Sequence, residues 1–190
     1  MKLFFLLVMI VSAFVVACNG EGKDSVEKAD SANAVRIDAA GRGQRAADKK
    51  TASFLTEAAD ITLAQSQLSE LAFQKSLDQK LKSFGSKMMR DHSMMNEAIK
   101  ALSAGLQVTI PTAVGETNQK KLDDLKAKDN EGFDKALTNT MVQLHENEIS
   151  LFEKASGNVD NADVKAFIDN GLPQLNIHLD SLKLIQKMLK

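Results

Sequence analysis

Three features of the 190-residue sequence predict an all-α fold, a four-helix bundle. Apolar residues recur at intervals of three and four in four long segments, the spacing that one buried face of an amphipathic helix requires. No stretch alternates apolar and polar residues as a half-buried strand would. Short turns join the first two segments and the last two, and a longer connection joins the pairs, as in a helical bundle.

The first two predicted helices meet near Ser76. In the first, of roughly 23 residues, Gln65 occupies one position of an otherwise apolar face. That face consists of Phe54, Ala58, Ile61, Leu68 and Ala72. The second helix ends at Gly105, a residue type that commonly terminates helices. Its unbroken face consists of Leu81, Phe84, Met88, His92, Met95, Ile99 and Leu102.

The connection between the helix pairs contains a loop and a short extra helix. Ile110-Pro111-Thr112 is predicted to be a loop, because proline lacks a backbone N–H. The stretch from Thr117 to Lys126 is predicted to be a short helix, which is interrupted near Asp129 to Gly132. We therefore expect one short helix outside the four long ones.

A third long helix is predicted from Phe133 to the pair Gly157-Asn158, where helix termination is favoured. Its apolar face consists of Phe133, Leu137, Met141, Leu144, Ile149 and Phe152. His145 lies on the same face, and Glu148 follows it one turn later. This helix therefore carries a histidine and a carboxylate toward the core.

The fourth helix is predicted to begin at about Ala162. Its apolar face consists of Val164, Phe167, Leu175, His178, Leu182, Ile185 and Leu189. Pro173 lies inside this pattern. Because proline removes one backbone hydrogen bond and crowds the preceding turn, we expect a kink near Gly171.

Residues 1–17 have the pattern of an export signal. Lys2 supplies a positive charge, and Leu3 to Ala17 is an apolar run that is shorter than the roughly 20 residues a spanning helix needs. Val15-Val16-Ala17-Cys18 resembles a bacterial lipobox, which implies lipid attachment at Cys18. We expect a lipid-anchored protein of the cell envelope, with outer-membrane attachment and its domain in the periplasm or at the cell surface. An ordinary signal peptide with a chance cysteine is the alternative.

Residues 19–50 are polar and have no aromatic side chain. Such a composition buries too little apolar surface to offset the entropy of ordering. We expect a flexible tether here, and a single four-helix bundle domain from residue 51 to residue 190.

The charge pattern excludes one class of partner. Lys and Arg (24) nearly balance Asp and Glu (25), giving a net charge of −1, and the sequence has no basic stripe. Nucleic-acid binding is therefore not expected. The one cysteine is the expected lipid anchor, and no Gly-x-Ser-x-Gly or glycine-rich phosphate loop occurs, so nucleophilic catalysis has no visible machinery.

The three histidines of the chain each lie on the apolar face of a different predicted helix. If the bundle has simple up-down-up-down order, His92 and His145 lie at the same level, roughly 20 Å from one end. His178 is then roughly 10 Å along the axis from His145, nearer the level of Glu57. One compact three-histidine site is compatible with this register but is not required by it.

Neutral imidazoles bind Zn, Cu, Fe and Ni, and thioethers select Cu(I). The candidate ligands, with Cu or Zn as the expected metal, are His92, His145, His178, Glu57, Asp91, Glu148, Met88 and Met95. Asp91 and Glu148 are alternatively residues that orient an imidazole. The methionines are alternatively core fillers, the histidines alternatively structural, and Glu57 alternatively a first-turn residue favoured by the helix dipole.

A di-iron site is not expected. That chemistry uses Glu-x-x-His on each of two helices. The residues three before the histidines are Met89, Val142 and Leu175.

Several motifs resemble those of the family called domain of unknown function 4142. They are Leu81 to Asn96 (LKSFGSKMMRDHSMMN), Ile110-Pro111-Thr112, Gly132-Phe133-Asp134, His145 with Leu151-Phe152-Glu153, and Leu172-Pro173 with His178-Leu179. The resemblance covers nearly all of Ser53 to Leu184 and implies an exported bacterial protein with a ferritin-like bundle. This sequence departs from the family pattern at Gln65 and Gln67, where acidic residues are common, and at Ala136, where tyrosine is common. It implies no activity.

The function favoured by the sequence is therefore a non-enzymatic envelope lipoprotein whose histidines bind a metal. The alternative is an interaction module with structural histidines, whose bundle surface docks an envelope protein. A metal-dependent oxidase ranks below both, since it needs a cavity and an open coordination position.

Overall fold

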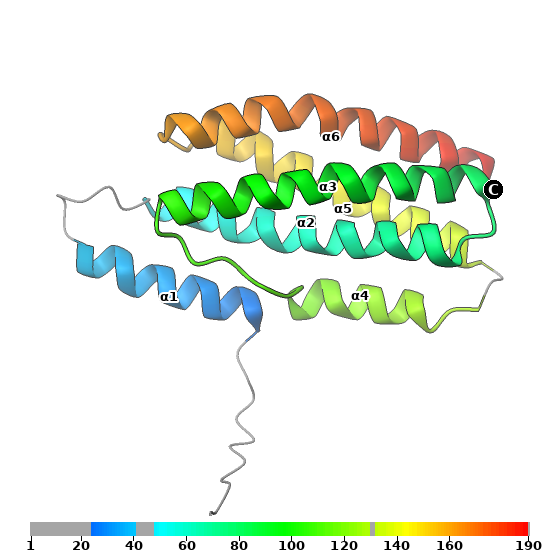
Figure 1. The fold of residues 1–190 in the computed structure, drawn as a ribbon, viewed down its shortest axis with the longest axis horizontal. Coiled ribbons are helices and arrows are strands. Elements are labelled where there is room, and N and C mark those ends of the chain that lie inside the picture. Colours follow the sequence, from blue (N-terminus) through cyan, green and yellow to red (C-terminus); the bar gives the residue numbers. More distant parts are fainter. Residues whose placement is uncertain (1–23, 41–47, 130–131, 190) are drawn as a thin grey trace, which may run out of the picture.

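The computed structural model describes residues 24–40, 48–129 and 132–189, which form six helices and no strand. Four long helices make the bundle (Figure 1): α2 (Lys49–Lys75), α3 (Gln79–Gly105), α5 (Phe133–Ser156) and α6 (Ala162–Met188). Two shorter ones pack outside it against α2: α1 (Ser25–Ala40) and α4 (Glu116–Lys126). The predicted helical bundle is confirmed. No helix within the described ranges has the length and apolarity needed to cross a membrane.

Helices α3 and α5 run in the same direction (Figure 1). The Asp134 carboxylate at the start of α5 accepts hydrogen bonds from the backbone of Leu77 and Asp78, just before α3, at 3.2 and 3.1 Å. The two helices therefore begin at the same end of the bundle. The assumption of up-down-up-down order is wrong, because the connection containing α4 carries the chain back along the bundle. One long crossover is a feature of ferritin-like folds.

The core consists of two apolar clusters that meet at a polar layer. The first contains Phe54 and Phe152, whose rings meet edge to face at 5.2 Å, and the second contains Phe133. On α3 the second cluster ends at Met88 and the first begins at Met95; on α5 the switch falls between Leu144 and Ile149. Polar residues buried at these boundaries are Thr62, Gln65, His92, His145, Glu148 and His178.

Residues 25–40 form α1, so the expected flexible tether is wrong for this part of residues 19–50. Asn33 is buried and exchanges two hydrogen bonds with the backbone of Thr109: Nδ2 donates to the carbonyl (2.9 Å) and Oδ1 accepts from the amide (2.7 Å). A polar side chain thus holds this helix in place, which an argument from apolar composition does not detect. The expected signal segment and Cys18 lie outside the described residues.

Helix α6 continues through Pro173 without interruption and curves along the bundle (Figure 1). The proline has no N–H to donate to the preceding turn, which favours such bending. A localised kink near Gly171 stays a prediction.

Candidate metal centre

The bundle places its three histidines at one level. Helices α3 and α5 begin at the same end of the bundle. Counted from that end, His92 is 13 residues after Gln79, the first residue of α3, and His145 is 12 residues after Phe133, the first residue of α5. His178 is 10 residues before Met188 on the antiparallel helix α6, which ends on that side. The predicted axial offset of His178 is therefore wrong. It assumed that α5 and α6 are level at the turn near Gly157, whereas α6 begins farther out than α5 ends (Figure 1).

The three imidazoles form a compact, buried cluster. Their ring centroids are 5.4 Å (His92 to His145), 5.7 Å (His92 to His178) and 5.8 Å (His145 to His178) apart. One nitrogen from each ring lies within 4.8 Å of the others, and all three side chains are buried. A trigonal metal ion bonded at 2.0–2.1 Å needs its nitrogens roughly 3.5 Å apart. The nitrogens therefore have to approach one another by no more than about 1.3 Å to close the cluster on an ion.

Hydrogen bonds within the protein occupy one ring nitrogen of His145 and one of His178, and leave the other nitrogen of each ring free to bind a metal ion. His145 donates from Nδ1 to the Met141 carbonyl at 2.9 Å, and His178 donates from Nε2 to Oδ2 of Asp91 at 2.8 Å. Their other nitrogens, Nε2 of His145 and Nδ1 of His178, have no partner, and neither nitrogen of His92 has one. Each ring thus keeps at least one lone pair available for a ligand.

Burial keeps these imidazoles neutral. It lowers the pKa of His145 to about 4, against a smaller upward effect of the Met141 hydrogen bond. Burial and the two neighbouring histidines hold the pKa of His92 well below its usual value. Burial also lowers the pKa of His178, although Asp91 opposes the shift. Neutral imidazole is the form that binds metal ions.

One side of the cluster reaches the surface at Asp91. Its carboxylate binds His178 and also accepts a 2.7 Å hydrogen bond from Lys87, one turn earlier on α3. Nε2 of Gln174 lies 2.6 Å from Nε2 of His178 and 3.4 Å from Asp91. Partial burial would raise the pKa of Asp91, but the contacts with Lys87 and His178 outweigh it and lower the pKa. Asp91 is therefore an ionised carboxylate that orients His178.

The opposite side of the cluster ends at Glu148, which is fully buried. Its Oε1 accepts a hydrogen bond from Thr62 at 3.1 Å, and its Oε2 has no partner. Burial raises the pKa of Glu148 to about 8, despite hydrogen bonds from Thr62 and Gln65. At neutral pH this carboxyl group is protonated.

Gln65 joins Glu148 to the cluster, because its amide lies 2.6 Å from Nδ1 of His145. That nitrogen also faces the Met141 carbonyl. Turning the amide over by 180° places its oxygen at the same N–H, so that one tautomer of His145 satisfies both contacts.

The remaining predicted ligands have different positions. Met88 and Met95 are buried one turn before and after His92, in the two apolar clusters. Glu57 is exposed and accepts a hydrogen bond from Ser53, so it does not join the cluster. On α2 the apolar face turns toward the core, and Glu57 lies beside it on the solvent side.

Three further polar side chains contact the site residues although no ligand pattern in the sequence marks them: Lys87, Gln174 and Thr62. The role of Lys87 could have been inferred from the sequence, since it precedes Asp91 by four residues, the spacing of a helical ion pair. The role of Gln65 is indicated more strongly, since this polar residue interrupts an apolar face. Gln174 and Thr62 have no comparable pattern.

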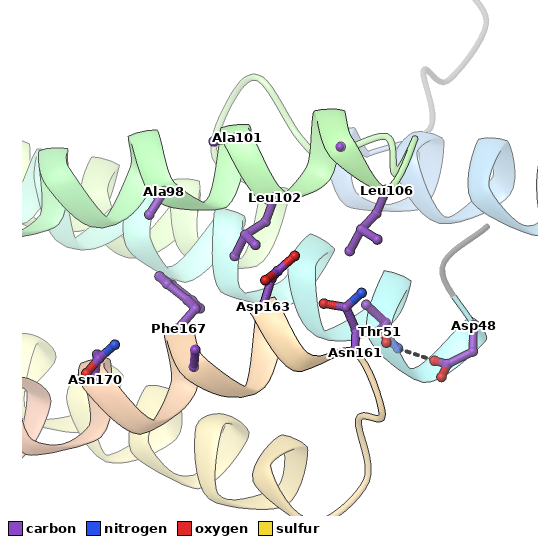
Figure 2. Close-up of a pocket in the computed structure, with 12 residues that line it drawn as sticks. Asp48, Thr51, Ala98, Ala101, Leu102, Leu106, Asn161, Asp163, Phe167 and Asn170 are labelled. Atoms are coloured by element: carbon purple, nitrogen blue, oxygen red, sulfur yellow. Dashed lines mark hydrogen bonds between the residues drawn. The ribbon is translucent and has the colours of Figure 1, made fainter. Parts of the chain in front are cut away.

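A groove of about 930 Å³ opens elsewhere, between the end of α3 and the starts of α2 and α6 (Figure 2). Apolar side chains such as Leu102 and Phe167 line it. Two polar side chains at its rim are already used as helix caps: Asp48 accepts from the Thr51 amide at 2.7 Å and Asn161 from the Val164 amide at 3.0 Å. The groove contains no histidine, and the histidine cluster is the better candidate site.

Comparisons with known proteins agree with the fold. The family model described as domain of unknown function (DUF4142) matches residues 21–185. A solved structure titled "CopM in the Cu(II)-bound form" superposes with a TM-score of 0.63 and 16% sequence identity, covering 73% of this chain and 97% of that one. At this identity the likeness shows the fold alone. A search of curated proteins found no match.

Proposed function

The chain belongs to the family described as domain of unknown function (DUF4142), and we propose that it binds one copper ion through His92, His145 and His178. The observation that carries the proposal is His92. It is fully buried, and neither of its ring nitrogens has a hydrogen-bond partner. A structural histidine in a core is normally hydrogen-bonded, because an unpaired buried polar atom costs about 1–3 kcal/mol. A metal ion bound by one ring nitrogen of His92 would supply the missing partner.

The choice of copper rests on two further points. The structurally similar CopM is described in a Cu(II)-bound form. The thioethers of Met88 and Met95 lie one turn on either side of His92, and such ligands favour Cu(I) over harder ions. Zinc is the second candidate, because three imidazoles and one further ligand make a common zinc site.

Metal titration of the full-length protein tests the proposal. Cu(I), Cu(II) and Zn(II) are titrated into wild type and into His92→Leu, His145→Ala and His178→Ala, with bound metal measured by elemental analysis. We expect one ion per chain in wild type and none in His92→Leu. Met94→Ala is the matched control, because Met94 is on the same helix and is 73% exposed.

The His92→Leu variant also separates binding from folding. Leucine removes two unpaired buried nitrogens and keeps an apolar side chain of similar reach, so the metal-free variant should be at least as stable as wild type. Binding that persists in His92→Leu, or wild-type protein that binds no copper, would contradict the proposal.

The cellular setting is part of the same proposal. An export signal in residues 1–17 and a lipobox cysteine at position 18 support attachment to an envelope membrane through a lipid on Cys18. The copper-binding domain would then work in the periplasm or at the cell surface. Membrane fractionation of wild type and Cys18→Ser tests this: release of the variant into the soluble fraction is expected.

A further inference from the structure

We infer that metal ions enter and leave the cluster through the seam between α3 and α6, and that Lys87 is the gate of this route. The inference rests on the proposed function, since it concerns how the same site is loaded. The gate residues are Lys87 and Asp91 on α3 and Gln174 on α6, which together cover His178.

His178 is the histidine nearest to solvent. Its side chain is 1% exposed, but its partner Asp91 is 24% exposed and Lys87 is 45% exposed. One layer of side chains therefore separates this imidazole from water. On the opposite side, His145 is backed by Gln65 and Glu148, which are themselves fully buried. The shortest polar path from solvent to the cluster passes Asp91.

The gate is held closed by polar contacts. Oδ2 of Asp91 accepts from Lys87 at 2.7 Å, from His178 at 2.8 Å and from Gln174 at 3.4 Å. Water replaces such contacts at small cost, and a solvent-exposed ion pair contributes about 0–1 kcal/mol. Local openings of this kind require little free energy, because the contacts that break are polar and lie at the surface.

The two helices also separate at one end of the same seam, beyond the gate. Ala98 on α3 and Asn170 on α6, roughly one to two turns from Asp91 and Gln174, line the groove of Figure 2. Between the groove and the gate, the Met95 methyl group lies near Gly171. The groove and the gate are therefore separated by this single methionine contact, and beyond it α3 and α6 are not closely packed.

The charge of Lys87 and the shielding of His178 by its side chain affect metal uptake and release separately. The Asp91 carboxylate attracts a metal cation, whereas the Lys87 ammonium repels it and the Lys87 stem covers His178. Lys87→Gln removes the charge and keeps most of the stem, without adding a thioether that could itself bind copper. Lys87→Ala removes both. A change of charge alone shifts uptake and release in opposite directions, whereas opening a route accelerates both.

Stopped-flow measurements distinguish these effects. Full-length wild type, Lys87→Gln and Lys87→Ala are mixed with Cu(II) to follow uptake, and the loaded proteins are mixed with excess chelator to follow release. We expect uptake roughly tenfold faster in Lys87→Gln, because the positive charge is lost, and faster again in Lys87→Ala, because the cover is lost as well. Release should be severalfold faster than in wild type only for Lys87→Ala.

Lys183→Ala is the matched control. Lys183 is 44% exposed, like Lys87, and pairs with Glu146 instead of Asp91, at 2.9 Å. We expect wild-type rates in this variant. Stoichiometric copper binding with release rates that Lys87→Ala leaves unchanged would overturn the gate alone. Wild-type protein that binds no copper would overturn the proposed function together with the gate.

Discussion

Two carboxyl groups flank the histidine cluster, and one is ionised whereas the other is neutral. Asp91 lies at the surface, its pKa lowered because the contacts with Lys87 and His178 outweigh its partial burial. Glu148 lies in the core, where burial raises its pKa to about 8. The same chemical group is thus an anion on one side of the cluster and a neutral acid on the other. The difference shows that burial and neighbouring charges, not residue type, decide what a carboxyl group contributes.

This asymmetry gives each side a separate task. The charged Asp91 holds His178 in one tautomer and presents a negative charge to solvent. The neutral Glu148 stays protonated beside Gln65 and His145. Keeping this proton lowers the free energy of unfolding as the pH rises.

The largest effect is expected for Glu148→Gln. The folded chain keeps a proton on Glu148 that the unfolded chain releases between pH 4.5 and 8, so the stability of wild type falls as pH rises through this window. Glutamine stays neutral and hydrogen-bonds similarly. Relative to wild type, the variant should gain about 4 kcal/mol between pH 4.5 and pH 8. Denaturant unfolding of metal-free protein at several pH values measures this gain.

Glu146→Gln is the control for that experiment. Glu146 is two residues away on α5 and pairs with Lys183 at the surface. Its substitution should leave the pH profile within about 0.5 kcal/mol of wild type. A Glu148→Gln profile that parallels wild type would mean that Glu148 is ionised in the folded protein.

The next largest effect is an acid limb in the metal-free wild type. Burial holds the pKa values of His92 and His145 low, so below pH 6.5 the unfolded chain binds protons that the folded chain does not, and stability falls as pH falls toward 4. Glu148 opposes this fall. The net loss should be about 3 kcal/mol from pH 6.5 to 4.5, which places maximal stability near pH 6.5. Urea unfolding with a chelator present reports it, and Glu148→Gln should steepen the limb. A flat profile would show that the histidines are not buried as neutral rings.

The smallest effect is expected for Asp91→Asn. Asparagine still accepts a hydrogen bond from His178, but the charge that favours the imidazole orientation is lost. Substitution of such orienting residues weakens metal binding roughly 10- to 100-fold. Competition titration with Cu(II) measures the change, and Asp180→Asn, an exposed position on α6, should bind like wild type. Equal affinities for Asp91→Asn and wild type would remove Asp91 from the site.

Much of the fold was predictable from local patterns. The helices containing His92, His145 and His178 follow from apolar spacing, and their ends at Gly105 and near Gly157 follow from residues that terminate helices. The place of α1 was not predictable in this way. Its few apolar residues, such as Ala29 and Ile37, do pack against the bundle, but the hydrogen bonds of Asn33 with Thr109 are not visible in an apolar pattern.

The candidate site was predictable only in part. Placing the histidines on buried helix faces needed no structure, nor did naming Asp91 and Glu148 as neighbours. Glu57 was misplaced because a position beside an apolar stripe does not reveal which way the helix turns in the bundle. Gln174 and Lys87 act from separate helices, and their meeting depends on the distance between α3 and α6.

By itself, the sequence determined five of the six helical segments, the buried faces of the four long helices and the identity of the imidazole donors. Helix formation and amphipathicity depend on residues within a few turns of one another, so these features can be read locally. Only the tertiary structure decided that α5 runs parallel to α3 and that all three histidines share one level. The connection between these helices is long enough to end at either end of the bundle, so its length does not set the direction of α5. Side-chain packing and the contacts of Asp134 with the start of α3 do.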